Sequence, residues 1–243
     1  MTRRRSIMVT IHLTGFLLIG AASAGLPAAA QVPEPAGFGV VVSADGHILV
    51  PYETINGCSA ITSPTLGPLR ILHIHEDLDL ALLQAPGGGT PHVALGDARA
   101  VDPWKPMIFG GPAARAAQAG ELARIPGRLF TVSSSRRNAL YMSFVIPEPQ
   151  AGNAVLVLDR FGGIAALVVH ELKPGVMLHG DSEIWAPIPR DGEVREKALG
   201  EALLRGFLDH QDVAYASAPA ERPLTAQETV EHLRTATTLI ECR

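Results

Sequence analysis

Short apolar segments separated by turn-forming residues follow one another along most of the chain. The first pair, Phe38–Ser43 and His47–Val50, is joined by Asp45-Gly46, a dipeptide that favours a tight hairpin turn. Short strands with turn signals roughly every 8–12 residues are typical of all-β barrels and sandwiches. Further strands are predicted at residues 59–63, 70–75, 78–84, 92–95, 105–109, 129–133, 139–146, 154–158, 163–169 and 183–187.

The C-terminal part of the chain has a different pattern. Residues 193–210 carry apolar side chains at helical spacing, which predicts a helix with one buried stripe. A second helix is predicted over 225–233, with Thr225 as its N-cap and Glu228 completing a capping box. Residues 237–242 are predicted as a final strand.

The N-terminus has the layout of an export signal. Arg3-Arg4-Arg5 precede the apolar stretch Ile7–Gly20, and small residues follow, ending at Ala24 and again at Ala30. A retained membrane anchor is the alternative, but this stretch is shorter than the roughly 20 apolar residues that a transmembrane helix needs. We therefore expect a signal peptide over 1–30, cleaved after Ala24 or Ala30, and a linker over 31–36. The mature chain is expected to be periplasmic or secreted, with no stable membrane anchor.

Two cysteines, Cys58 and Cys242, lie far apart in the sequence. In an oxidising compartment they are able to pair, so we predict a disulfide between them. The alternative is two separate buried thiols. Two cysteines by themselves cannot supply the four ligands of a structural zinc site.

Four motifs occur in a fixed order along the chain. Gly37–Leu49 forms the first hairpin, and residues 79–83 read Asp-Leu-Ala-Leu-Leu. Residues 150–154 read Gln-Ala-Gly-Asn-Ala, and Val157–Gly163 follows with Leu-Asp and two glycines. The first three motifs resemble the HtrA-like, trypsin-type serine protease segments that lead to the catalytic histidine, carry the aspartate and carry the serine. The fourth is similar to the hairpin that follows the serine. Their order and spacing over residues 37–243 make the resemblance specific.

The resemblance implies an all-β fold, a chymotrypsin-like double β-barrel with a C-terminal helical segment. We expect an N-terminal barrel over 37–103, a C-terminal barrel over 104–191, and a helical tail with a terminal strand over 192–243. The resemblance also identifies the triad positions, which are occupied here by Glu53, Asp79 and Ala154.

These three positions lack the groups that acyl transfer requires. The reaction needs a hydroxyl nucleophile, a base to take its proton and a carboxylate to orient the base. Asp79 could orient an imidazole, but Glu53 is a weaker base, and Ala154 has no nucleophile. Val155 and Leu156 stand where the family has glycines, so we expect the oxyanion-hole geometry to be spoiled. Loss of the nucleophile or base alone costs about 10⁶-fold in a comparable triad.

The preferred interpretation is therefore a catalytically inactive pseudoprotease that binds a peptide or protein in the groove between its barrels, by addition of an extended strand. The alternative is an active serine endopeptidase with a non-standard site. The other hydroxyl cluster, Ser133-Ser134-Ser135, is more typical of a polar hairpin tip, and no base for it is identifiable. Whether Glu53 has acquired a role of its own is left open.

A third interpretation is a metal-binding envelope scaffold. His73 and His75 would share one face of a strand, which is how a metal site can begin, although an exposed polar strand edge is the simpler interpretation. No cofactor is expected. A nucleic-acid partner is not expected either, because the net charge is −4 and the 20 Lys and Arg residues are scattered.

Overall fold

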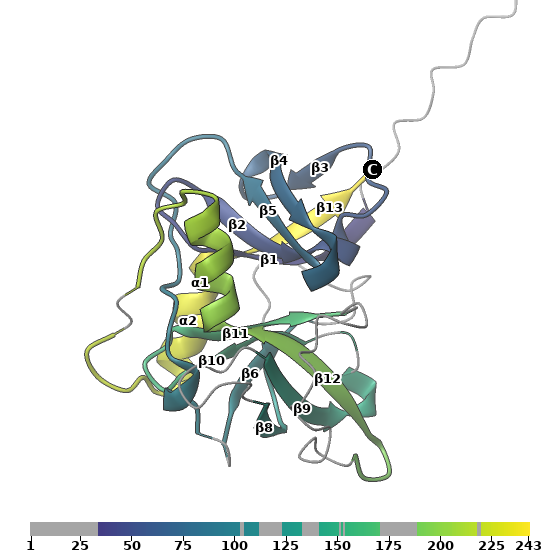
Figure 1. Cartoon of the computed structure of the whole chain (residues 1–243), viewed down its shortest axis with the longest axis vertical. Coiled ribbons are helices and arrows are strands. Elements are labelled where there is room, and N and C mark those ends of the chain that lie inside the picture. Colours follow the sequence, from purple (N-terminus) through teal and green to yellow (C-terminus); the bar gives the residue numbers. More distant parts are fainter. Residues whose placement is uncertain are drawn as a thin grey trace, which may run out of the picture. The chain divides into compact units, whose positions relative to one another are not determined.

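The computed structural model describes residues 34–102, 105–111, 123–132, 141–150, 152, 154–170, 189–217 and 220–243, all within the compact unit Val32–Arg243. They form two antiparallel β-sheets and two helices (Figure 1). The strands of the first sheet are β1 (Glu34–Val41), β2 (His47–Pro51), β3 (Ile61–Ser63), β4 (Gly67–His75), β5 (Leu80–Gln84) and β13 (Thr237–Cys242). The strands of the second sheet are β6 (Met107–Gly110), β7 (Ala123–Ile125), β8 (Arg128–Val132), β9 (Tyr141–Pro147), β10 (Ala154–Leu158), β11 (Ile164–Val169) and β12 (Glu193–Gly200). The helices are α1 (Glu201–His210) and α2 (Ala226–Ala236).

The first sheet is a closed barrel with the strand order β1-β13-β3-β4-β5-β2. Its opening hairpin turns at Asp45-Gly46 as predicted, with a positive φ of 82° at Gly46 and a hydrogen bond from the Gly46 N–H to the Ser43 carbonyl. The predicted final strand is confirmed, and β13 closes the barrel between β1 and β3. Residues 34–36 were predicted as linker and instead belong to β1, because Glu34 and Pro35 pair with the end of β13.

The predicted disulfide is confirmed. Cys58, in the loop after β2, is bonded to Cys242, the last residue of β13, with a Cα–Cα distance of 5.3 Å. The disulfide therefore links the C-terminal strand β13 to the loop that follows β2 near the start of the barrel.

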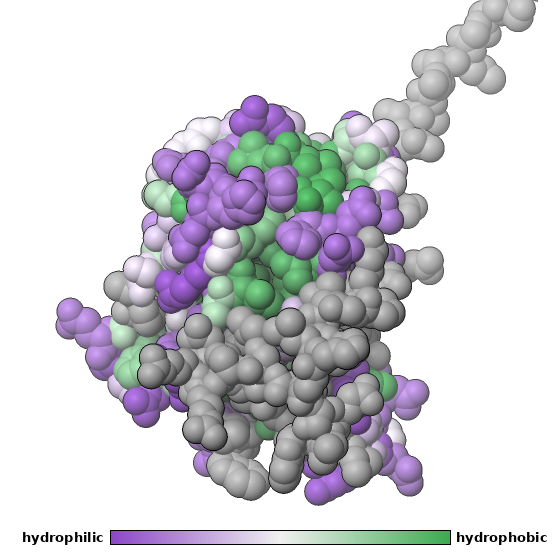
Figure 2. All heavy atoms as spheres, viewed as in Figure 1, coloured by the Kyte–Doolittle hydropathy of each residue, from purple (hydrophilic) through white to green (hydrophobic). Residues whose placement is uncertain are grey.

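A bulge in β4 explains an apolar area on the outside of this barrel. The register of β4 against β5 shifts between Ile71 and His73, so consecutive residues turn outward. Ile71 and Leu72 are consequently exposed, and apolar surface is visible over β3 and β4 at the top of Figure 2.

The second sheet has seven strands in the order β7-β6-β10-β11-β12-β9-β8. Here the predicted helix over 193–210 is wrong for its first eight residues, which form β12 between β9 and β11. The sequence Glu-Val-Arg-Glu-Lys-Ala-Leu consists mainly of good helix formers, but ladder pairing on both sides overrides that local preference. The helix begins only at Glu201, after Gly200.

The remaining predictions have mixed outcomes. The capping box of α2 is confirmed, with Thr225 and Glu228 bonded reciprocally. Residues 92–95 do not form a strand, and only Leu95 makes an isolated bridge, to Ile164. The three-residue strand β7 carried no clear sequence signal and was missed. The signal peptide, the strand at 183–187 and the serine cluster at 133–135 lie outside the described residues.

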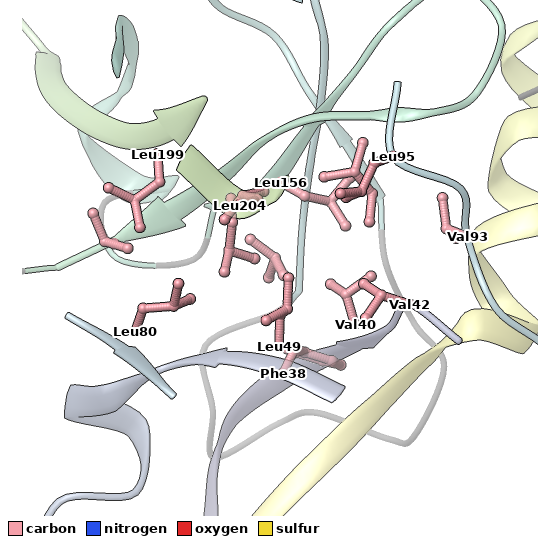
Figure 3. Packing of buried hydrophobic residues seen from close by; sticks show 14 of the residues in the cluster. Phe38, Val40, Val42, Leu49, Leu80, Val93, Leu95, Leu156, Leu199 and Leu204 are labelled. Carbon is pink, nitrogen blue, oxygen red and sulfur yellow. The ribbon is translucent and has the colours of Figure 1, made fainter. Parts of the chain in front are cut away.

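One apolar cluster spans the two sheets. Phe38, Val40 and Leu49 of the barrel, together with Leu80, meet side chains from the second sheet and from α1, as Figure 3 shows for Leu156, Leu199 and Leu204. Burial of this shared surface is the main force that holds the sheets together. It also positions the turns at the ends of these strands, where the candidate site lies. Neither described helix is long and apolar enough to span a membrane.

Candidate functional site

Asp79 connects the two sheets through its carboxylate. It ends the short 3₁₀ turn Glu76–Leu78 in a left-handed conformation (φ 49°) and is only 3% exposed. Asp tolerates this conformation better than most residues do. Its Oδ1 accepts the backbone N–H of Glu53 at 2.7 Å, and its Oδ2 accepts the backbone N–H of His170 at 2.8 Å. One buried carboxylate thus satisfies two backbone donors from different sheets.

Glu53 lies directly beside Asp79. It is the middle residue of the 3₁₀ turn Tyr52–Thr54, which follows β2, and the Tyr52 N–H donates to the Asp79 carbonyl at 3.1 Å. The Glu53 side chain is exposed, so its carboxylate points to solvent while its backbone is held by Asp79.

His170 was not assigned to the site from the sequence. It follows the last residue of β11, its side chain is exposed, and it meets Asp79 through its backbone. Because both N–H groups bind the same carboxylate, Glu53 and His170 lie next to each other at the boundary of the two sheets. No local sequence signal marks this position, since the contact joins residues 91 positions apart.

Ala154 lies in the second sheet, whereas Glu53 and Asp79 lie at turns of the first barrel. It begins β10, pairs with Gly110 and is 3% exposed. Its methyl group belongs to the apolar cluster inside the second sheet, with Ile108 and Ile125. In the part of the chain described here, no hydrogen bond or shared apolar cluster joins Ala154 to Glu53 or Asp79. The next residue, Val155, instead packs in the cluster between the sheets.

The backbone N–H of Gly152, two positions before Ala154, is also engaged. In a trypsin-type site, the N–H groups of the nucleophile and of the residue two positions before it form the oxyanion hole. Here the latter position is Gly152, with φ 71°, and its N–H donates to the Glu196 carboxylate at 3.0 Å. The Gly152 N–H is therefore already bound by a carboxylate.

A serine and a histidine are in hydrogen-bonding contact elsewhere. Ser43 Oγ and His47 Nδ1 are 2.7 Å apart across the first hairpin turn, and burial lowers the pKa of His47, while the nearby Asp45 charge raises it. Ser43 is only 2% exposed, and its hydroxyl also accepts the His47 N–H at 3.2 Å. A nucleophile must reach its substrate, and Ser43 is buried. The hydrogen bonds between Ser43 and His47 therefore stabilise the hairpin turn.

The two candidate metal ligands lie on β4, at alternate positions as predicted. His73 pairs with Leu82 and His75 with Leu80, and the His73 ring packs against Phe207 of α1 with centroids 5.6 Å apart. Within the described ranges, no three His, Cys, Asp or Glu side chains are grouped so that they could hold a metal ion.

Comparison with known proteins gives structural matches only. No family model matches the sequence, and no curated protein matches it. An HtrA-type protease, AlgW, solved with a decapeptide, aligns with a TM-score of 0.50 and 15% identity, over 72% of this chain and 50% of that one. The chain thus spans about half the length of that protease. The MamO protease domain from Magnetospirillum magneticum, in its apo form, aligns with a TM-score of 0.42 and 14% identity, over 72% of this chain and 89% of that one. Together with the closed barrel, the second sheet and the order of the strands, the match to the HtrA-type protease shows that this chain has the trypsin-like, chymotrypsin-type fold.

Proposed function

We propose that this chain is a catalytically inactive, trypsin-like protein of the cell envelope that binds a peptide or protein as an added β-strand. The observation that carries the proposal is the pair of positions Gly152 and Ala154. Ala154 has a buried methyl group in place of a hydroxyl, and the Gly152 N–H donates a hydrogen bond to the Glu196 carboxylate.

The Asp79 side of the site supports the same conclusion. In a working triad the aspartate binds and orients an imidazole. Here its two carboxylate oxygens accept backbone N–H groups from Glu53 and His170. Glu53, at the position of the imidazole, directs its carboxylate to solvent.

Peptide binding is proposed from the fold and from the open edges of its second sheet. The matched HtrA-type protease was solved with a decapeptide. In the described part of this chain, the second sheet ends at β7 on one side and at β8 on the other. Edge strands present unpaired backbone groups, to which an extended peptide can add as a further strand. The closed barrel offers no such edge.

An envelope location is proposed from the signal-like N-terminus and the disulfide. Disulfides form and persist in oxidising compartments such as the periplasm. Cell fractionation with a C-terminal tag, together with N-terminal sequencing of the exported chain, tests this location. Export is expected, with cleavage after Ala24 or Ala30, and retention of the uncleaved chain in the cytoplasm would contradict it.

The test of inactivity is labelling with a fluorophosphonate, which modifies activated serines covalently. No labelling is expected under conditions in which trypsin is labelled completely. The Ser43→Ala variant identifies the source of any signal. Labelling of the unaltered chain that disappears in this variant would show that Ser43 and His47 form an active pair, and it would overturn the proposal.

Binding is tested separately with a library of fluorescent decapeptides, by polarisation and then by hydrogen exchange. Binding is expected, with amide protection concentrated in β7 or β8. If no decapeptide binds, or if protection falls only on the closed barrel, strand addition to the second sheet is wrong, whatever the outcome of the labelling.

A further inference from the structure

A cavity of about 730 Å³ lies away from the site described above. Four segments form it: the segment after β5 around Gly96–Ala100, the β10–β11 turn, the first turns of α1, and Ser217 in the segment after α1. None of Glu53, Asp79 and Ala154 lines it. A ligand bound in this cavity would therefore not depend on the proposed function.

Six charged side chains line this cavity, three of each sign: Asp97, Asp159, Glu201, Arg99, Arg160 and Arg205. Their existing partners decide which of them are available to a ligand. The number of opposite charges alone would not indicate a ligand, because acids and bases on a protein surface commonly neutralise one another.

Two of the acids are already engaged. Asp159 is completely buried, and its carboxylate accepts the N–H groups of Asp97, Phe161 and Gly163 at 2.8–2.9 Å. Asp97 is bound by the Arg99 guanidinium in a two-pronged ion pair, with the Arg99 Nη2 to Asp97 Oδ2 distance at 2.8 Å.

Arg205 is engaged as well. Its Nη2 donates to the carbonyls of Leu95 and Gly96 at 3.0 and 2.9 Å, and its guanidinium lies 5.8 Å from the centre of the Tyr215 ring. These contacts hold α1 against the segment that follows β5, so Arg205 has a structural task.

Arg160 remains available, and so does one oxygen of Glu201, whose carboxyl also meets the backbone N–H of Ala98. The Oε2 atom of Glu201 is buried and has no hydrogen-bond partner in the described residues. Burial is also the main reason that the pKa of this carboxyl is raised. The Arg160 guanidinium lies 4.8 Å from the centre of the Phe161 ring and is exposed, and no ion pair or hydrogen bond holds it within the described part of the chain.

A buried carboxyl oxygen without a donor is costly, and a cavity that contains a group with a shifted pKa is a candidate binding site. The missing partner of Glu201 is a hydrogen-bond donor, best a cation, and the missing partner of Arg160 is an anion. We propose that this cavity binds a small zwitterion of the amino-acid type, with its ammonium group against Glu201 and its carboxylate against Arg160.

The experiment is titration calorimetry on the full chain with glycine, L-alanine, L-leucine, L-glutamate and L-lysine as separate probes. At least one of these amino acids is expected to bind, and the N-acetyl derivative and the methyl ester of that amino acid are expected not to. Each derivative removes one of the two charges on which the proposal depends. If none of the five binds, or if either derivative binds as tightly as the free amino acid, the proposal is wrong.

Two variants and a control assign the binding to this cavity. Glu201→Gln and Arg160→Gln are each expected to weaken binding by about tenfold or more, since each removes a charged hydrogen bond. Arg234→Gln, which alters an exposed arginine on α2 outside the cavity, is expected to leave the affinity unchanged. Because Arg160 is exposed, its replacement is expected to keep the fold, and undiminished binding in Arg160→Gln overturns the proposal even if Glu201→Gln fails to fold.

Discussion

The Asp79 carboxylate in the first barrel accepts the backbone N–H of His170, at the end of β11 in the second sheet, at 2.8 Å. Its other oxygen accepts the N–H of Glu53. Both bonds are made to the backbone, so neither depends on an imidazole or on a serine. The aspartate of the trypsin-like motif therefore has a structural task in this chain that is separate from catalysis.

Replacement of Asp79 by alanine is expected to destabilise the protein. It leaves the N–H groups of Glu53 and His170 without their acceptor, and each unpaired, partly buried donor costs roughly 1–3 kcal/mol. The left-handed backbone at this position adds to the loss, since alanine avoids it. We expect a total loss of about 2–6 kcal/mol in the free energy of unfolding, measured with urea. Asp79→Asn keeps one acceptor oxygen, so its free energy of unfolding should lie between those of the original chain and the alanine variant. An alanine variant as stable as the original chain would contradict this role.

Local patterns in the sequence predicted the first hairpin, the capping box of α2 and the final strand, because each depends on neighbouring residues. The helix expected over 193–210 was wrong for residues 193–200, because two flanking strands decide the structure of those residues. The bonds of His170 to Asp79 and of Gly152 to Glu196 could not be predicted, since their partners are 91 and 44 positions apart. The direction of the Ala154 methyl group likewise depends on how β10 pairs with β6.

Restoring the two missing side chains is not expected to restore a serine nucleophile. In the double variant Glu53→His, Ala154→Ser, the new hydroxyl would lie in the apolar cluster inside the second sheet, and Gly152 would remain bound to Glu196. We expect no fluorophosphonate labelling and a loss of about 1–2 kcal/mol in the free energy of unfolding for burial of the hydroxyl.

Ala166→Ser provides the matched control, because Ala166 belongs to the same cluster and is fully buried. It should lose a similar free energy and should also remain unlabelled. Labelling of the double variant alone would show that residue 154 can reach a reactive position, and the proposed orientation of its side chain would be wrong.

The disulfide between Cys58 and Cys242 is expected to contribute strongly to stability. It links residues 184 positions apart, and closing a loop of this size stabilises by about 5 kcal/mol in the chain-entropy model, with measured losses of roughly 2–5 kcal/mol. Urea unfolding with and without a reducing agent should show a loss in this range. The double variant Cys58→Ser, Cys242→Ser should be equally destabilised and insensitive to the reducing agent. If reduction leaves the midpoint unchanged, the bond does not form in the protein.

The raised pKa of Glu201 predicts a pH dependence of opposite sign to that of an ordinary ion-paired carboxylate. The folded chain holds this proton more tightly than the unfolded chain, whose value is near 4.5. The associated stability is therefore fully present below that pH and is lost as the pH rises through the folded-state pKa. Glu201→Gln removes this loss, so its stability relative to the original chain should increase from pH 4 to pH 7 in thermal unfolding. A constant difference between the two proteins across that range would show that burial does not perturb this carboxyl.

Glu228 should show the opposite dependence. Hydrogen bonds from Arg222 first, and then from Thr225, lower its pKa from 4.5 to about 2. Its contribution to stability is therefore present above pH 4.5 and is lost as the pH falls toward 2. Glu228→Gln should flatten the decline in melting temperature over this window, and added salt should reduce the difference, because the pair is at the surface. Glu231→Gln removes an exposed ion pair with Arg234 on the same helix without touching the capping box, so it should leave the decline unchanged. If both variants flatten the decline equally, the effect belongs to the general charge of α2 and not to its N-terminal cap.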